Sequence, residues 1–328
     1  MTKKNNITKK NTSKSNAKNS IIKNNDSKNI SNISKKNDSK NKSNIKSNVI
    51  SVIVSIIMFL LVSLIFFYPT ISNYIANKQF QSTITNYTEK IEKVPEQDLS
   101  AEYDKAVKYN NQLNGKEIHD PFEPGTGYVL PENYKDVLNI YGDGIMGYIE
   151  IPKISLKLPI YHTSSDKVLE KGVGHLETTA LPIGGAGNNP ILTGHRGLPQ
   201  AELFTRLDEL KKGNIINIHV LNDHLSYEVD DIKVIKPTDV NTLQSIPNKD
   251  MITLITCTPY GVNTHRLVIQ GKRVPYVEPK KIKESNISTV KITESMKSRI
   301  YGIIGGIVIL LILLFIFKKR KNKNEKES

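Results

Sequence analysis

The sequence predicts a mostly β fold, a closed barrel of about eight strands with short helices, preceded by N-terminal helices and a loop and flanked by two transmembrane helices. Two observations support this prediction. Between Gly144 and Pro275, runs of four to eight apolar or β-branched residues alternate with Pro, Gly, Asn and Asp, which is typical of short strands joined by turns. Two uncharged apolar runs, 49–68 and 300–317, are each long enough to cross a bilayer as a helix.

The positive charge of the chain belongs to its two tails. The formal net charge is +14, to which residues 1–48 contribute +11 (13 Lys, 2 Asp) and residues 318–328 contribute +4 (six Lys or Arg, two Glu). The difference leaves −1 for everything between the tails, so nucleic-acid binding by the folded part is not predicted. Both tails are low-complexity segments that cannot bury a core, and we expect them to be disordered.

The two apolar runs are predicted to anchor the protein in the cell membrane. The first span, 49–69, has an alternative as a cleaved signal peptide, but 48 residues precede it and no small-x-small site follows it. The second span, 300–317, has an alternative as a buried core helix, but the basic "KKRK" follows it directly. Because Lys-rich segments stay in the cytoplasm, we expect both tails inside and residues 70–299 outside.

Residues 70–115 are expected to form two extracellular helices. The first, over 71–93, continues out of the membrane as a polar helix. The second follows Pro95, with Ser100 as its predicted N-cap and Gly115 as its stop. Its apolar residues recur at helical spacing: Leu99, Tyr103, Val107 and Leu113.

Residues 116–136 are predicted to form a loop. They contain three Pro and two Gly, which argue against a helix or strand interior. Structureless loops of this length are commonly lids or disordered segments. The motif "DPF" at 120–122 places a carboxylate beside an aromatic ring, although a local turn with a surface aromatic is the alternative.

The barrel is expected over residues 137–276. Its strand-like runs are MGYIEIPK, LKLPIYH, NPILTGH, NIINIHVL, LSYEVDDIKVI, MITLITC and HRLVIQGKR. One helical patch at 199–213 interrupts them, with three leucines on one face and Gly213 as its stop. The Lys/Ser/Glu-rich residues 277–299 are expected to form a juxtamembrane stalk.

Cys257 is the only cysteine, so it cannot form an intrachain disulfide and is either inert and buried or kept for chemistry. If the runs on either side of "TPYGVNTH" pair antiparallel, the centre of the turn falls between Gly261 and Val262, and Cys257 lies opposite Arg266. Directly opposed residues have Cβ atoms roughly 4.5–5.5 Å apart. A cation at this distance lowers the pKa of a thiol, and a guanidinium can stabilise an oxyanion.

A cysteine nucleophile also needs a group that donates and accepts protons. Of the seven histidines, only His195 directly follows a strand-like run and has glycines on both sides, Gly194 and Gly197, which permit close approach. His219 and His224 lie in a predicted hairpin and are expected to be structural or solvated. On spacing alone, a buried cysteine with a structural histidine elsewhere remains the alternative.

No metal or organic cofactor is predicted. No cluster of His, Cys and Asp has the spacing of metal ligands. The Gly-rich "GGAGNN" at 184–189 lacks the Lys-Ser/Thr pair of a phosphate-binding loop, so we interpret it as a turn.

Two motifs, "TLITCTPYGVNTHRL" and "ILTGHRG", together resemble the signature of the sortases, the membrane-bound cysteine transpeptidases of Gram-positive bacteria. The resemblance extends over residues 144–274 and includes "IPKI", "LPIYH", "GVGHLE", "LPIGG" and "LFTRLDEL". It implies a sortase-type β-barrel with Cys257 as the nucleophile and with His195 and Arg266 as its catalytic partners.

The "DPF" loop and the second apolar run resemble the class C, or pilus-assembling, sortases. Members of that class carry a lid whose aspartate and aromatic residue lie over the active site. The resemblance therefore implies that Asp120 pairs with Arg266 and that Phe122 covers Cys257.

In the implied reaction, Cys257 attacks the Thr-Gly carbonyl of an LPxTG-like sorting signal on a pilin or surface protein. Arg266 holds the oxyanion and His195 protonates the leaving amine. An amine acceptor, a pilin lysine or a peptidoglycan precursor, then resolves the thioacyl enzyme. The alternatives are a sortase of another class that attaches proteins to the cell wall, an extracytoplasmic cysteine hydrolase, and an anchored binding or adhesion module in which the cysteine only packs.

Overall fold

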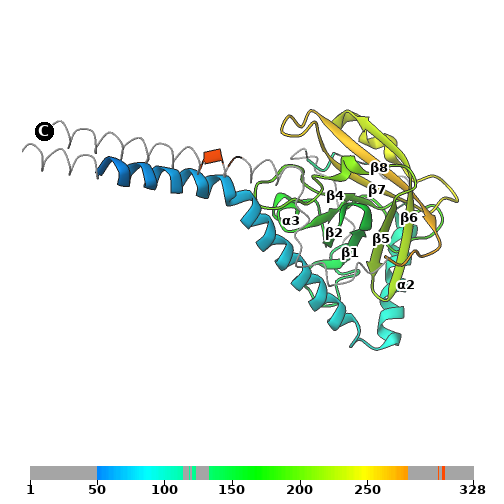
Figure 1. The fold of residues 1–328 in the computed structure, drawn as a ribbon. Coiled ribbons are helices and arrows are strands. Elements are labelled where there is room, and N and C mark those ends of the chain that lie inside the picture. The colour runs from blue at the N-terminus through cyan, green and yellow to red at the C-terminus, as the bar shows by residue number, and fades with distance from the viewer. Residues whose placement is uncertain are drawn as a thin grey trace, which may run out of the picture. The chain divides into compact units, whose positions relative to one another are not determined.

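The structure is a computed structural model (Figure 1), and it describes residues 50–113, 118, 120–122 and 133–279 together with Gly302, Gly305 and Gly306. Several predicted segments lie outside these residues: both tails, most of the 116–136 loop, nearly all of the 277–299 stalk and most of the second apolar run. The chain divides into two compact units, Phe67–Ser288 and Met1–Phe66 with Thr289–Ser328.

A single helix, Ile50–Ile91, contains the first apolar run and the predicted polar continuation. Among the described residues, it is the one helix that is long and apolar enough to cross a membrane. The apolar side chains at 50–68 are largely exposed, as expected of residues that face lipid. A second membrane span stays a prediction.

The later half of this helix buries one stripe of apolar side chains, Phe80, Ile84, Tyr87 and Ile91. Their spacing of three and four residues places them on one helix face, which packs into the hydrophobic core. The Tyr87 hydroxyl donates a hydrogen bond to the Met146 carbonyl at 3.0 Å and accepts one from the Leu221 amide at 3.0 Å. The part of the helix from Phe67 onward therefore belongs to the same compact unit as the barrel.

Helix α2 (Glu96–Gln112) begins one turn earlier than predicted, so the assignment of Ser100 as its N-cap was wrong. Pro95 occupies the N-cap position, and its carbonyl accepts hydrogen bonds from two amides of the first turn. The acidic Glu96 and Asp98 lie in that turn, where they complement the positive end of the helix dipole. The helix ends at Gln112, and the predicted stop lies outside the described residues.

Eight strands close into a barrel in the order β1-β2-β3-β4-β7-β8-β6-β5, which confirms the predicted closed barrel. Neighbours β2 and β3, and likewise β4 and β7, pair in parallel, whereas all other neighbours pair antiparallel. The strands are β1 (Ile145–Ile151), β2 (Leu156–His162), β3 (Val173–His175), β4 (Ile191–Thr193), β5 (Ile215–Val220), β6 (Asp223–Ile235), β7 (Met251–Thr258) and β8 (His265–Val274).

All seven strand-like runs form strands, and the eighth strand, β3, had no such run. It has only three residues, too few for an apolar alternation to be visible. The remaining short elements are η1 (Pro152–Ile154), α3 (Asp166–Leu169), η2 (Leu207–Glu209) and η3 (Pro237–Leu243).

The patch at 199–213 is not an α-helix, contrary to the prediction. It consists of turns and the short η2, in which the amides of Thr205 and Leu207 donate to carbonyls three residues earlier. Leu203 has a positive φ of 40°, which an α-helix cannot contain. The three leucines, Leu203, Leu207 and Leu210, are nevertheless buried as predicted.

The Asp120 segment is attached to the barrel through a small apolar cluster. Ile118 is buried with residues of β4, β7 and β8, and Phe122 packs against the same cluster. This cluster holds Ile118 and Phe122, one on either side of Asp120, beside the strands that carry the candidate active site.

Candidate active site

Cys257 and Arg266 face each other across the antiparallel pair β7–β8. The register pairs Cys257 with Arg266 and Thr258 with His265, which confirms the predicted arrangement around the turn. Cys257 is 8% exposed and Arg266 is 4% exposed. Cys257 and Arg266 are therefore cross-strand neighbours at the end of the barrel where β7 ends.

His195 follows the end of β4 and reaches the same end of the barrel. The parallel pairing of β4 with β7 matches Thr193 with Ile255, so two further residues along each strand bring His195 level with Cys257. Beyond the last pair, the Gly194 amide donates to the Ile255 carbonyl at 3.3 Å. The hydroxyl of Thr256 on β7 donates to the Gly194 carbonyl at 2.7 Å. These bonds extend the strand pairing up to His195.

The glycines on either side of His195 are required by space and by backbone conformation. A Cβ on Gly194 would lie 2.9 Å from the ring of Phe204, closer than carbon atoms can approach without a shift. Gly197 has a φ of +85°, and a Cβ there would lie 3.0 Å from the ring of Tyr260. At both positions a side chain would therefore meet an aromatic ring.

Arg266 is held by a carboxylate from outside the barrel. Its Nε donates to Asp120 Oδ1 at 2.8 Å and its Nη2 donates to Asp120 Oδ2 at 2.5 Å. The geometry is bidentate, which is the strongest form of this ion pair. The Nη1 atom donates to the carbonyls of Asn263 and His265 at 3.0 and 3.2 Å. The predicted pairing of Asp120 with Arg266 is therefore present.

Phe122 lies against two of the three site residues. Its ring centroid is 5.1 Å from Arg266 Cζ and 6.1 Å from the centroid of the His195 ring. A guanidinium at that distance from an aromatic ring makes a cation–π contact. That Phe122 also covers Cys257 stays a prediction.

The surroundings of the candidate site disfavour charge on both the Cys257 thiol and the His195 imidazole. Burial raises the pKa of the Cys257 thiol above its ordinary value; the Arg266 guanidinium opposes this rise and the Asp120 carboxylate adds to it. Burial lowers the pKa of the His195 imidazole, and the carboxylates of Asp166 and Glu170 oppose that change. A neutral thiol and a neutral imidazole are therefore the main forms at neutral pH in this closed arrangement.

His175, His219 and His224 have structural surroundings. His219 and His224 lie in the β5–β6 hairpin, as predicted, and the structure shows them as a cross-strand pair with their Nδ1 atoms 2.8 Å apart. His175 is fully buried and bonded to the Tyr134 hydroxyl at 3.0 Å. Across the part of the chain that is described, no three His, Cys, Asp or Glu side chains gather to hold a metal ion.

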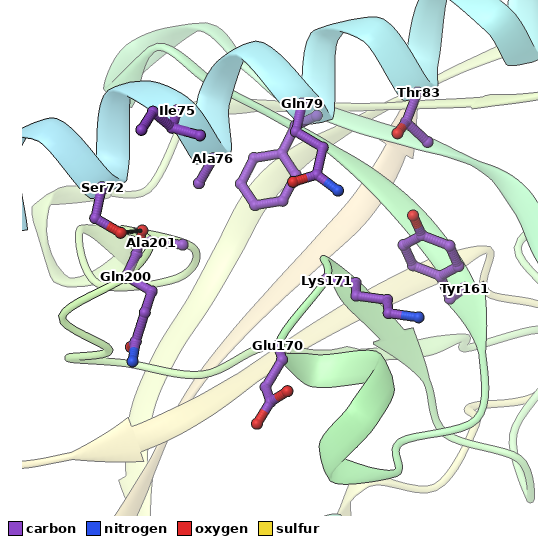
Figure 2. Close-up of a pocket in the computed structure, with 11 residues that line it drawn as sticks. Ser72, Ile75, Ala76, Gln79, Thr83, Tyr161, Glu170, Lys171, Gln200 and Ala201 are labelled. Carbon is purple, nitrogen blue, oxygen red and sulfur yellow. Dashed lines mark hydrogen bonds between the residues drawn. The ribbon is translucent and has the colours of Figure 1, made fainter.

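A cavity of about 240 Å³ lies elsewhere, between the long helix and the barrel (Figure 2). Gln79 of the helix, Glu170 after α3 and Gln200 line it, and the Ser72 hydroxyl donates to the Gln200 carbonyl at 3.1 Å. None of the three site residues lines this cavity. It is therefore separate from the candidate active site.

Arg196 is a polar residue of the site that sequence reasoning missed. Its Nη1 donates to the Thr258 hydroxyl at 3.0 Å, and its Nη2 pairs with Asp208. The residue was visible in the "TGHRG" motif, but its long-range partner could not be identified from spacing.

Together, the fold and the site define a class of protein: a β-barrel that brings a thiol, an imidazole and a guanidinium to one end is suited to acyl transfer through a cysteine. Residues 149–274 match the family model described as a sortase domain. A sortase C structure from Streptococcus pneumoniae is 39% identical, with a TM-score of 0.55, over 61% of this chain and 100% of that chain. The chain belongs to the sortase family.

Two further relatives agree with this assignment. A pilus-related sortase C of Group B Streptococcus is 40% identical, with a TM-score of 0.54, over 58% of this chain and 97% of that chain. Sortase D of Bacillus subtilis (strain 168) is 33% identical over 131 residues, which cover 39% of this chain and 63% of that protein. The chain thus matches slightly less than two thirds of the length of this relative.

Proposed function

We propose that this protein is a membrane-anchored transpeptidase of the class C kind. It cleaves an LPxTG-like sorting signal between Thr and Gly and transfers the acyl group to the lysine amine of a pilin, which polymerises pili. The observation that carries the proposal is the register that sets Cys257 against Arg266, with His195 two residues beyond the end of the neighbouring strand β4.

The first half-reaction forms a thioester. Cys257 gives its proton to His195, and the thiolate attacks the carbonyl carbon of the signal's Thr. Arg266 donates hydrogen bonds to the oxyanion. The C–N bond then breaks, and the proton on His195 goes to the departing Gly amine. The acyl group is left on the sulfur of Cys257.

The second half-reaction reverses these steps with a different amine. The lysine amine attacks the thioester carbonyl, gives a proton to His195 and displaces the thiolate, which takes the proton back. The new bond is an amide between the Thr carboxyl and the lysine side chain. Water in place of the amine gives hydrolysis, so the two activities differ only in which nucleophile reaches the thioester.

The residues around Asp120 and Phe122 act as the lid of this site. Asp120 engages Nε and Nη2 of Arg266, and an oxyanion needs donors of this kind. Asp120 must therefore leave before Arg266 can hold an oxyanion. Phe122 moves with it and uncovers His195.

The class C assignment and the choice of acceptor rest on the structural neighbours. Two of them are sortase C enzymes, one described as pilus-related and one studied for pilin substrate specificity. The proposed topology has two membrane spans, with both basic tails in the cytoplasm and residues 70–299 outside.

Mass spectrometry of the protein incubated with a sorting-signal peptide tests the proposal directly. We expect a peptide thioester on Cys257, and none in the Cys257→Ala variant. With a lysine-bearing pilin domain present, we expect a cross-linked product. Free acid as the only product with and without the pilin would favour a hydrolase. A Cys257 that forms no thioester and resists alkylation would favour an anchored module in which the cysteine only packs.

A further inference from the structure

We propose that Arg196 is a positioning residue for this reaction, which holds the strand end that carries His195 against the strand end that carries Cys257. The inference rests on the proposed function, because it concerns how the two reacting groups are brought together. It does not assign Arg196 any contact with the substrate.

The contacts of Arg196 join the two strand ends next to the reacting groups. Arg196 directly follows His195, and its Nη1 donates at 3.0 Å to the hydroxyl of Thr258, which directly follows Cys257. Its side chain is only 8% exposed. One buried guanidinium therefore connects the residues that come immediately after the imidazole and the thiol.

This connection matters because β4 is short. Only Ile191–Thr193 pair with β7 in the regular ladder. The hydrogen bonds that continue this pairing end at Gly194, whose carbonyl accepts a hydrogen bond from the Thr256 hydroxyl. His195 lies beyond these bonds, at a strand end that would otherwise be free to separate. Arg196 ties the chain back to β7 one residue later.

Arg196 acts through geometry rather than through charge at the thiol. The charges that act on Cys257 are those of Arg266 and Asp120, whereas the charge of Arg196 is matched by Asp208. The buried Nε of Arg196 has no hydrogen-bond partner among the described residues. Burying a donor without a partner lowers stability, so stability alone does not explain an arginine at this position.

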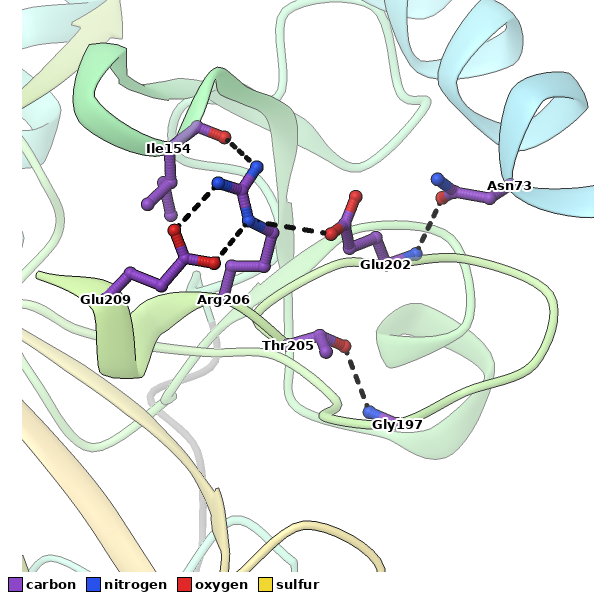
Figure 3. A network of polar contacts seen from close by, with 7 residues as sticks. All are labelled: Asn73, Ile154, Gly197, Glu202, Thr205, Arg206 and Glu209. Carbon is purple, nitrogen blue, oxygen red and sulfur yellow. Dashed lines mark hydrogen bonds and ion pairs between the residues drawn. The ribbon is translucent and has the colours of Figure 1, made fainter. Parts of the chain in front are cut away.

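The backbone around Arg196 is braced on its other side as well. The His195 carbonyl accepts from the Phe204 amide at 3.1 Å. The Gly197 amide donates to the Thr205 hydroxyl at 3.1 Å (Figure 3). These bonds hold the loop to itself. Arg196 is what joins the loop to the strand end at Thr258.

A second arginine of the same loop provides a matched control. Arg206 donates to the Ile154 carbonyl at 3.0 Å and makes a bidentate pair with Glu209 at 2.7 and 2.8 Å (Figure 3). It braces the loop against η1, away from the strand ends that carry the thiol and imidazole. Loss of either arginine should weaken the loop, but only loss of Arg196 should move His195 relative to Cys257.

The first test compares Arg196→Lys with Arg206→Lys in the full chain. A lysine has one ammonium nitrogen in place of the planar fork, so it does not reproduce the separate contacts of Nη1 with Thr258 and of Nη2 with Asp208. We expect Arg196→Lys to lower kcat for peptide cleavage roughly tenfold or more while KM stays within about twofold, because displacement of a reacting group acts on the chemical step. Arg206→Lys should lower Tm without that loss of kcat. Equal kcat in the two variants would overturn the inference.

The second test measures position without catalysis. In a His195→Cys background, copper-phenanthroline oxidation should form a disulfide between positions 195 and 257, because neighbouring strands bring Cα atoms within disulfide range. We expect Arg196→Lys to slow this reaction several-fold and Arg206→Lys to leave its rate unchanged. Equal rates in both would overturn the inference. If the wild-type protein forms no thioester, the proposed function fails, and the disulfide rates still decide the role of Arg196.

Discussion

At the scale of single residues, the ion pair between Asp120 and Arg266 determines the charge state and the hydrogen bonding of the closed site. Both side chains are almost fully buried, at 2% and 5% exposed, and a buried charge left without its partner is strongly unfavourable. The same carboxylate adds to the rise in the pKa of Cys257. The closed site thus keeps Cys257, the proposed nucleophile, protonated and keeps Nε and Nη2 of Arg266, the proposed oxyanion donor, engaged by Asp120.

Asp120→Asn should make Cys257 more reactive. Burial and the Asp120 carboxylate both raise the pKa of the thiol, so removing the negative charge lowers that pKa and increases the thiolate fraction at neutral pH. We expect iodoacetamide to alkylate the variant several-fold faster at pH 7, because the thiolate is the form that reacts. The measurement is the pH dependence of the alkylation rate.

Two further variants complete this test. Phe122→Ala should also speed alkylation, because it uncovers the site without removing a charge. Asp104→Asn, an exposed residue of α2, should change nothing. Identical alkylation profiles for the wild type, Asp120→Asn and Phe122→Ala would contradict the proposed lid.

At the scale of elements, the short strand β3 closes the barrel and carries a buried histidine. It joins β2 in parallel and β4 antiparallel, and without it the sheet would have two open edges. His175 bonds to the Tyr134 hydroxyl and, through Nε2, to the Ala180 carbonyl at 2.8 Å. A neutral imidazole can make both of these hydrogen bonds, one as acceptor and one as donor. Protonation of His175 is therefore unfavourable in the strand that closes the barrel.

Acid should therefore destabilise the fold through His175. Burial lowers its pKa to about 4, whereas an unfolded histidine titrates near 6.5. Between these values the unfolded state binds more protons, so stability is full above pH 6.5 and falls as the pH drops towards 4, by about 3 kcal/mol in total.

Denaturant unfolding at pH 7.5, 6, 5 and 4.5 measures this effect. His175→Gln should be less stable at pH 7.5, because it loses part of the hydrogen bonding, but its stability should depend less on pH. His162, whose pKa burial also lowers, contributes in the same direction and remains in both proteins. Parallel pH profiles for the wild type and His175→Gln would show that His175 is not responsible.

At the scale of the whole molecule, the charge distribution predicts the orientation in the membrane. The two basic tails account for the net charge of the chain, and such segments stay in the cytoplasm. The helix Ile50–Ile91 leads without interruption from the first apolar run into the compact unit of the barrel. A second span would return the chain to the cytoplasm at residues 318–328.

Single-cysteine labelling tests this topology. In a Cys257→Ala background, Ser13→Cys and Ser328→Cys each place one thiol in a tail, and Ser245→Cys places one on the exposed barrel surface. In intact protoplasts, a membrane-impermeant maleimide should label only Ser245→Cys, and permeabilisation should allow labelling of all three. Labelling of Ser328→Cys before permeabilisation would contradict the second span.

The sequence by itself was sufficient for features that depend on neighbours along the chain. Seven strands followed from apolar runs, and the facing of Cys257 and Arg266 followed from a hairpin whose register depends only on the turn between them. Local rules also predicted His195, since the strand end and its two glycines lie within three residues of one another. The motifs that resemble sortases are equally local, and the family assignment confirmed them.

The tertiary structure alone decided features that need distant partners. The three-residue β3 exists because β2 and β4 lie on either side of it. The leucines of 199–213 are buried from turns and the short η2, although their spacing predicts an α-helix. Arg196 meets Thr258 across 62 positions. Such contacts depend on how the barrel closes, and barrel closure is a property of all eight strands together that no single stretch of sequence encodes.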